Sequence, residues 1–137
     1  MIVDLSGKIG YNQLVEPDQK YKRWTLDLYL DDESKQKFAE TGLQNEFKKD
    51  QDGEEYIRLG RPVQKIIKDE LVKFTPPSIW YNQKKYNGKF IPKGSDVTVR
   101  MEVYATIKGP GSRIEKVRID TLAEYVRSTE ARDEVPF

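Results

Sequence analysis

Apolar and polar residues alternate strictly in two long segments of the chain, residues 24–30 and residues 97–104. A period of two residues is typical of β-strands that bury one face. Shorter alternations at residues 3–5, 57–59 and 117–119 predict three further strands. The pattern therefore predicts five strands and a mainly β fold.

One helix is predicted between the second and third strands, from Asp32 to about Thr41. Acidic residues in its first turn interact favourably with the helix dipole. Phe38 is expected to face inward, and Gly42 is placed to end the helix. Two hairpins are predicted as well. Residues 108–112 link the last two strands, and Asn87-Gly88 forms the tip of a second, basic hairpin.

A chain of 137 residues with 36% hydrophobic content is long enough for one domain with its own core. Five strands and one helix fit a small barrel better than a sandwich, which needs more strands. We therefore expect a five-stranded OB-type barrel with one short helix and a β-hairpin extension. The barrel is expected over residues 1–125, and a flexible tail over residues 126–137.

The chain contains no cysteine and no histidine, which excludes disulfide, thiolate and imidazole chemistry and removes the usual ligands of zinc. No cofactor and no metal site are predicted. No segment approaches the roughly 18 apolar residues of a membrane-spanning helix, and the first residues lack the pattern of a signal peptide. These features favour a cytoplasmic protein with no membrane partner.

The net charge is only +1, but the charges are unevenly distributed. Residues 31–55 hold nine acidic side chains and four lysines, whereas residues 73–100 hold six basic side chains and one acidic one, Asp96. Where a polyanion can bind depends on this distribution more than on the sum. The chain is therefore polarised into an acidic and a basic region.

The last five residues, Asp133, Glu134, Val135, Pro136 and Phe137, combine two acids with an apolar stub and an aromatic ring. They resemble the acidic C-terminal tip by which bacterial single-stranded-DNA-binding proteins recruit replication and repair enzymes. The resemblance implies that the ring enters an apolar pocket of a protein partner while the carboxylates meet basic residues at its rim.

A second resemblance lies in residues 92–104, where Pro-Lys-Gly-Ser-Asp precedes an alternating strand and a glycine-rich turn. This segment is similar to the late β-hairpin of phage single-stranded-DNA-binding proteins with OB folds. Together the two resemblances imply a non-catalytic protein that protects single-stranded DNA without sequence preference and recruits replication or recombination proteins. Its location would be the host cell cytoplasm if a phage encodes it.

A single-strand binder needs aromatic rings on which bases stack, together with Lys and Arg for the phosphates. Residues 20–24, 56–61 and 80–90 each contain this mixture, although Trp24 is expected to lie in the core and packing within the sheet is the alternative for each other ring. The candidate DNA-binding residues are Tyr21, Arg23, Tyr56, Arg58, Arg61, Trp80, Tyr81, Lys84, Lys85, Tyr86 and Lys89.

Two other classes of function fit parts of the sequence. A magnesium-dependent nuclease would use carboxylates on the predicted strands, although no D-x-D motif lies on those strands and no phosphate-binding glycine motif marks such a site. An RNA-binding or protein-interaction barrel could use the same basic and aromatic face, because DNA and RNA differ here only in contacts to the 2′-hydroxyl. The candidate carboxylates for the nuclease are Asp4, Asp27, Glu102 and Asp120.

Overall fold

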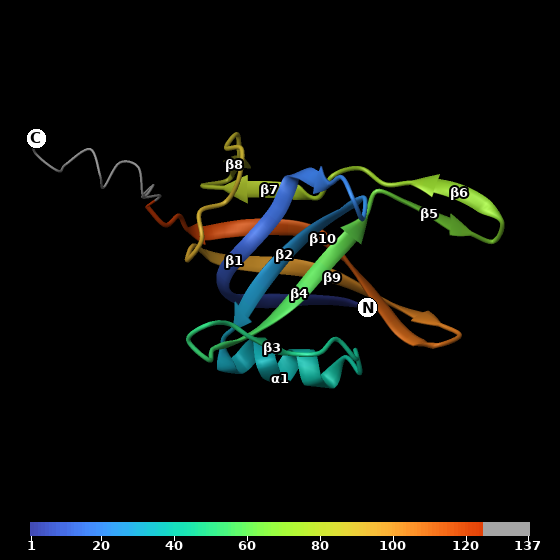
Figure 1. Ribbon diagram of the computed structural model, residues 1–137, viewed down its shortest axis with the longest axis horizontal. Helices are drawn as coiled ribbons and strands as arrows, with labels where there is room; N and C mark the ends of the chain where they lie inside the picture. The colour runs from blue at the N-terminus through green and yellow to red at the C-terminus, as the bar shows by residue number, and fades with distance from the viewer. Residues whose placement is uncertain (125–137) are drawn as a thin grey trace, which may run out of the picture.

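The computed structural model describes residues 1–124 and shows a mainly β fold with one short helix, as predicted (Figure 1). The predicted tail, residues 126–137, lies outside the described residues. The elements are β1 (Ile2–Asp18), β2 (Arg23–Leu30), α1 (Asp32–Glu40), β3 (Lys48–Lys49), β4 (Glu55–Pro62), β5 (Gln64–Ile67), β6 (Glu70–Lys73), β7 (Ser78–Tyr81), β8 (Lys84–Lys85), β9 (Asp96–Thr106) and β10 (Gly109–Thr121).

Eight strands form one sheet in the order β3-β4-β2-β1-β9-β10-β7-β8, and β5 pairs only with β6. The expectation of a closed, five-stranded barrel is wrong, because no backbone ladder within residues 1–124 joins β4 to β10. The sheet curls until these two strands are in contact. The guanidinium of Arg61 on β4 then donates a hydrogen bond to the carbonyl of Ile114 on β10, at 3.0 Å, where a closed barrel would have backbone pairs.

The curl follows from irregularities in the long strands. The register of β1 against β2 shifts between Ile9 and Asn12, and the register of β10 against β9 shifts between Ile114 and Lys116. The amide of Asn12 fixes the first bend because it donates to the carbonyl of Ile91, at 2.8 Å. Bulges of this kind bend a strand and increase its twist. They let β1 pair with both β9 and β2.

Inward-facing side chains of β1, β2, β4, β7, β9 and β10 form a single core together with Phe38 and Ile91, as the alternation in β2 and β9 predicted. Burying this apolar surface is the main favourable contribution to folding. The most deeply buried members are Leu5, Ile9, Leu14, Leu26, Leu28, Ile57, Leu59, Ile91, Val97, Val99, Met101, Ile114 and Val117.

The helix α1 covers one end of this core. Its N-cap residue Asp31 accepts a hydrogen bond from the backbone of Ser34, and the Ser34 hydroxyl accepts one from the backbone of Ser6 on β1, both at 2.7 Å. Phe38 is buried in the core and Gly42 ends the helix with a φ of 75°, so both predictions are confirmed. Within residues 1–124, no helix has the length and apolar character needed to span a membrane.

The hairpin predicted at Asn87-Gly88 turns elsewhere. The strands β7 and β8 are joined by Asn82 and Gln83, which both have positive φ values, 51° and 65°. Asn87-Gly88 instead lies in the following loop, where the hydroxyl of Tyr86 donates to a backbone carbonyl and its ring fills the space beside Gly88. An Asn-Gly pair favours a tight turn, but here the packing of Tyr86 decides its conformation.

The predicted hairpin between the last two strands is confirmed, but its turn lies at Ile107 and Lys108, because residues 109–112 pair with β9 as the start of β10. A second hairpin, β5–β6, was not predicted, and we call it the hairpin arm. At its base the backbone N–H of Phe74 donates to the carbonyl of Val63, at 2.8 Å. The backbone N–H of Val63 donates to the carbonyl of Lys22, at 3.1 Å. The arm and the tip of the β9–β10 hairpin project from the same end of the molecule (Figure 1).

Close pairing of β1 and β2 gives a test of the fold. Gly7 pairs with Leu30, and a Cβ added there would lie 2.0 Å from the carbonyl oxygen of Tyr29. Gly7→Ala must therefore push the strands apart, and we expect it to lower the free energy of unfolding in urea by about 1–3 kcal/mol. Lys8→Ala, which removes an exposed ion pair, should cost less than about 1 kcal/mol. Wild-type stability for Gly7→Ala would contradict this pairing.

Candidate nucleic-acid interface

The structure separates the predicted DNA-binding residues into two groups, because β1, β9 and β10 lie between them in the sheet. The first group, on β2, β4 and the turn before β2, is Tyr21, Arg23, Tyr56, Arg58 and Arg61. The second group, on β7, β8 and the loop after β8, is Trp80, Tyr81, Lys84, Lys85, Tyr86 and Lys89.

Part of the first group forms a cluster that we call the tyrosine face, made of Tyr29, Tyr56 and Arg58. The two rings lie 5.5 Å apart, with an angle of 50° between their planes. Asp27 accepts two hydrogen bonds from Arg58, at 2.7 and 3.1 Å, and these bonds raise the pKa of Arg58. Burial and the hydrogen bond donated to Asp50 raise the pKa of Tyr29 to about 12. The cluster therefore combines two aromatic rings with an arginine that Asp27 holds in place.

Tyr21 and Arg23 lie beyond the tyrosine face, toward the base of the hairpin arm. Tyr21 is 67% exposed, and the ammonium of Lys20 lies 5.2 Å from the centre of its ring. Arg23 lies across Gly60 of β4, where an added Cβ would be 2.4 Å from a guanidinium nitrogen. Gly60 thus leaves the space that Arg23 occupies.

Cations and aromatic rings alternate between the hairpin arm and the β9–β10 hairpin, in a site that we call the hairpin groove. It is made of Arg61, Lys65, Phe74, Tyr104 and Arg113. The guanidinium carbon of Arg113 lies 5.0 Å from the ring centre of Tyr104 and 5.1 Å from that of Phe74. The ammonium of Lys65 lies 5.3 Å from the ring centre of Tyr104, and the guanidinium carbon of Arg61 lies 5.2 Å from that of Phe74. Two cations therefore lie near each ring, whose negative face attracts positive charge.

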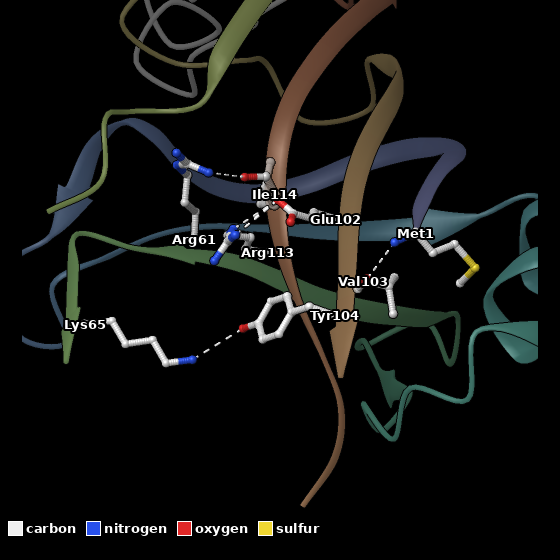
Figure 2. Close-up of polar contacts among 8 residues, drawn as sticks. All are labelled: Met1, Arg61, Lys65, Glu102, Val103, Tyr104, Arg113 and Ile114. Atoms are coloured by element: carbon white, nitrogen blue, oxygen red, sulfur yellow. Dashed lines mark hydrogen bonds and ion pairs between the residues drawn. The ribbon is translucent and has the colours of Figure 1, made fainter. Parts of the chain in front are cut away.

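Hydrogen bonds fix the two arginines of the groove (Figure 2). Arg61 donates to the carbonyls of Thr75 and Ile114, at 2.7 and 3.0 Å. Arg113 donates to the carboxylate of Glu102, at 3.2 and 3.3 Å. Burial, and then the charge of Arg113, lower the pKa of Arg61. An anion placed between these cations would relieve their repulsion, so the site favours a negatively charged ligand.

The groove also has apolar walls and room for a ligand. Lys65, Tyr104 and Arg113 border an open depression of about 1070 Å³, and the exposed side chains of Ile66 and Ile107 line it from the two hairpins. Tyr104 reaches from β9 toward Lys65 on the arm (Figure 2). The arrangement can stack bases on a ring while neighbouring cations meet phosphates.

The second predicted group is less uniform. The rings of Tyr81 and Tyr86 are partly buried against the core and meet edge to face, 6.4 Å apart. Trp80 is 39% exposed on β7, whereas Lys84, Lys85 and Lys89 are all exposed. The structure therefore places Trp80 and the lysines at the surface and gives both tyrosines a packing role.

The four carboxylates considered for a nuclease do not converge. Within residues 1–124 no group of three or more acidic residues is placed to hold a metal ion. Each candidate instead pairs with an arginine on its own or a neighbouring strand, and the pairs are Asp4–Arg100, Asp27–Arg58, Glu102–Arg113 and Asp120–Arg118.

Sequence reasoning found Arg61 but missed the other four residues of the hairpin groove. Tyr104 was identified only as an outward residue of a strand, and Lys65 and Phe74 belong to the unpredicted arm. One signal was present in the glycine-rich turn. Gly111 pairs with Tyr104, and a Cβ added to it would lie 2.8 Å from the tyrosine ring. The glycine lets the ring of Tyr104 lie across β10.

Comparison with solved structures identifies the architecture. The protein gp2.5, a single-stranded DNA-binding protein encoded by bacteriophage T7, matches with a TM-score of 0.61 and 15% identity, over 99% of this chain and 97% of that chain. The chain has the fold of phage single-stranded-DNA-binding proteins. The predicted resemblance is thus confirmed for the fold.

Two further structures agree. The single-stranded DNA-binding protein from bacteriophage Enc34, as a C-terminal truncation, matches with a TM-score of 0.60 and 12% identity, over 91% of this chain and 88% of that chain. The Enc34 protein in complex with single-stranded DNA matches with a TM-score of 0.59 and 12% identity, over 90% and 88%. No protein-family model and no curated protein sequence matches the chain.

The ion pair of Asp4 predicts an acid dependence of stability. The hydrogen bonds from Arg100, at 2.8 and 3.0 Å, hold the pKa of Asp4 below its usual value of 3.8. The ionised carboxylate therefore stabilises the fold above that value, and this stabilisation is lost as the pH falls through the lowered pKa. We expect Asp4→Asn to be less stable than wild type near pH 7, and the difference to shrink below pH 3.8. A difference independent of pH would contradict the ion pair.

Proposed function

We propose that this protein binds single-stranded DNA without sequence preference. The observation that carries the proposal is the hairpin groove, where cations and rings alternate as a chain of phosphates and bases requires. The fold supports it, because gp2.5 of bacteriophage T7 and the Enc34 protein, which share it, are single-stranded DNA-binding proteins and the latter has been solved with its DNA.

In the proposed complex, bases stack on Tyr104 and phosphates meet Lys65 and Arg113. The strand continues over Tyr21 and Arg23, near the base of the hairpin arm, toward the tyrosine face. OB folds commonly bind oligonucleotides on this part of the sheet, between the first and the last hairpin loops. Stacking and phosphate contacts are available to every base, so the site has little means of reading sequence.

An RNA strand would contact the same side chains, so a binding experiment has to distinguish RNA from DNA as the ligand. A binding panel with single-stranded DNA, duplex DNA and RNA of one length and sequence measures the preference. We expect single-stranded DNA to bind most tightly. A clear preference for RNA would overturn the proposed ligand while leaving the proposed site in place.

Tyr104 gives the sharpest test of the site. We expect Tyr104→Ala to weaken binding of every oligonucleotide sequence by about 1–3 kcal/mol, because a stacked base loses its partner. Tyr104→Phe keeps the ring and should retain near wild-type affinity. Lys65→Ala should reduce the slope of log K against log salt by about 0.7, the value for one phosphate on a single strand.

The measurement is fluorescence anisotropy of labelled oligonucleotides over a range of salt concentrations. Lys35→Ala is the matched control, since Lys35 is an exposed lysine on α1, away from both hairpins. If Tyr104→Ala bound as wild type, or if Lys35→Ala changed the salt slope as much as Lys65→Ala, the hairpin groove would not be the binding site.

We also propose, from the sequence alone, that Asp133–Phe137 recruits a replication or recombination protein. Removing residues 135–137 should leave folding and DNA affinity unchanged and abolish capture of that partner in pull-downs. A peptide of residues 128–137 should displace the partner from the full-length protein. Capture that survives the truncation, or that the peptide does not compete, would show that these residues are not the docking element.

A further inference from the structure

Trp80 occupies an unusual place for a tryptophan. It lies on β7 and is 39% exposed, whereas the chain's other tryptophan, Trp24, is 4% exposed in the core. The side of β7 that buries Ile79 faces the core, so Trp80 points to the outer surface of the sheet. An exposed indole is costly to leave in water and offers a large face for stacking.

Basic residues lie on both sides of Trp80 in the sheet. Arg118 on β10 is its partner in one direction, and Lys85 on β8 is its partner in the other. Trp80, Lys116 and Arg118 together line a pocket of about 220 Å³ with Thr98. Within the described residues Lys116 makes no ion pair, so its ammonium is available to a ligand.

The acidic groups near this pocket are already paired. Asp4 accepts two hydrogen bonds from Arg100, and Asp120 accepts one from Arg118, at 2.6 Å. Arg118 also donates to the hydroxyl of Thr98, at 3.1 Å, but its side chain is 67% exposed and its guanidinium has donors beyond these two bonds. The surroundings of Trp80 therefore keep an excess of positive charge.

The outer surface of β9 and β10 connects this pocket to the hairpin groove. Tyr104 and Thr98 both face outward on β9, and Arg113 and Arg118 both face outward on β10. Six residues of strand separate Tyr104 from Thr98, a span of about 20 Å. At about 3.4 Å for each stacked nucleotide, some six nucleotides cover that distance.

We infer that Trp80 stacks a base of the same single strand that occupies the hairpin groove, so that the strand wraps around the curled sheet. Lys85, Lys116 and Arg118 hold the phosphates on either side of that base. The inference rests on the proposed function and adds to it a second contact site and a minimum length of strand. Short strands fill the groove alone, and only longer ones reach Trp80.

The two tryptophans make the inference measurable. Oligothymidylates of about 4 and about 12 nucleotides, lengths within the range that one OB fold covers, are titrated while anisotropy reports binding and tryptophan fluorescence reports stacking. We expect the longer strand to quench the fluorescence and the shorter one to leave it nearly unchanged. Trp80→Phe should remove the quenching, because Trp24 is buried.

Affinity provides the second readout. Trp80→Ala should weaken binding of the longer strand by about 5- to 100-fold and change binding of the shorter strand less than about twofold. Lys116→Ala, which leaves the indole in place, should weaken binding of the longer strand only and make the salt dependence of that binding shallower. Lys35→Ala again serves as the control, and circular dichroism checks that each variant is folded.

Each other outcome has a distinct meaning. If the longer strand binds without quenching, or if Trp80→Ala weakens both lengths equally, the second contact site is wrong while the proposed function stands. If neither strand binds to the wild-type protein, the proposed function itself fails.

Discussion

The open seam between β4 and β10 determines the rest of this structure. Two strands that lie in contact without a backbone ladder leave N–H and C=O groups that need partners. Arg61 is a partner for one of these carbonyls, since its guanidinium donates to that of Ile114 on β10, and it also donates to that of Thr75 beyond the arm. A side chain thus bridges the place where hydrogen-bonded strands would close a barrel. Because the seam stays open there, the hairpin arm can leave the sheet and form one wall of the groove.

The outer surface is built from cross-strand ion pairs, and this affects how such a surface can bind a polyanion. The chain is 34% charged, yet its net charge is +1. Arg58, Arg100 and Arg113 each hold a carboxylate on a neighbouring strand. A phosphate that approaches them shares its cation with that carboxylate, which reduces the electrostatic gain. Binding on such a surface depends more on stacking than it does for a strongly basic protein.

Sequence patterns predicted what depends on local periodicity and failed where distant contacts decide. Alternation identified β2 and β9, and capping residues identified α1, because each signal is contained in a few consecutive residues. The hairpin arm escaped detection because its turn residues, Lys68 and Asp69, include no glycine or proline, although both have positive φ. Closure of the barrel could not be judged either. It depends on bulges and on the bond between Arg61 and Ile114, 53 residues apart.

The same limits explain which residues of the site the sequence predicted. Arg61 was found because it follows an aromatic and basic strand, whereas Arg113 and Phe74 meet only through the fold. Two glycines are a signal of the site that the sequence patterns did not use, because Gly60 and Gly111 leave the space that the side chains of Arg23 and Tyr104 occupy.

The hairpin arm joins the sheet through few backbone contacts at its base, at Val63 and Phe74. None of its residues belongs to the buried core. Insertions, deletions and substitutions in the arm can therefore accumulate without a cost to the folding of the sheet. Related proteins can diverge in the width and reach of the groove while the core stays constant. Selection can in this way change the shape of the groove through one short, separately evolving segment.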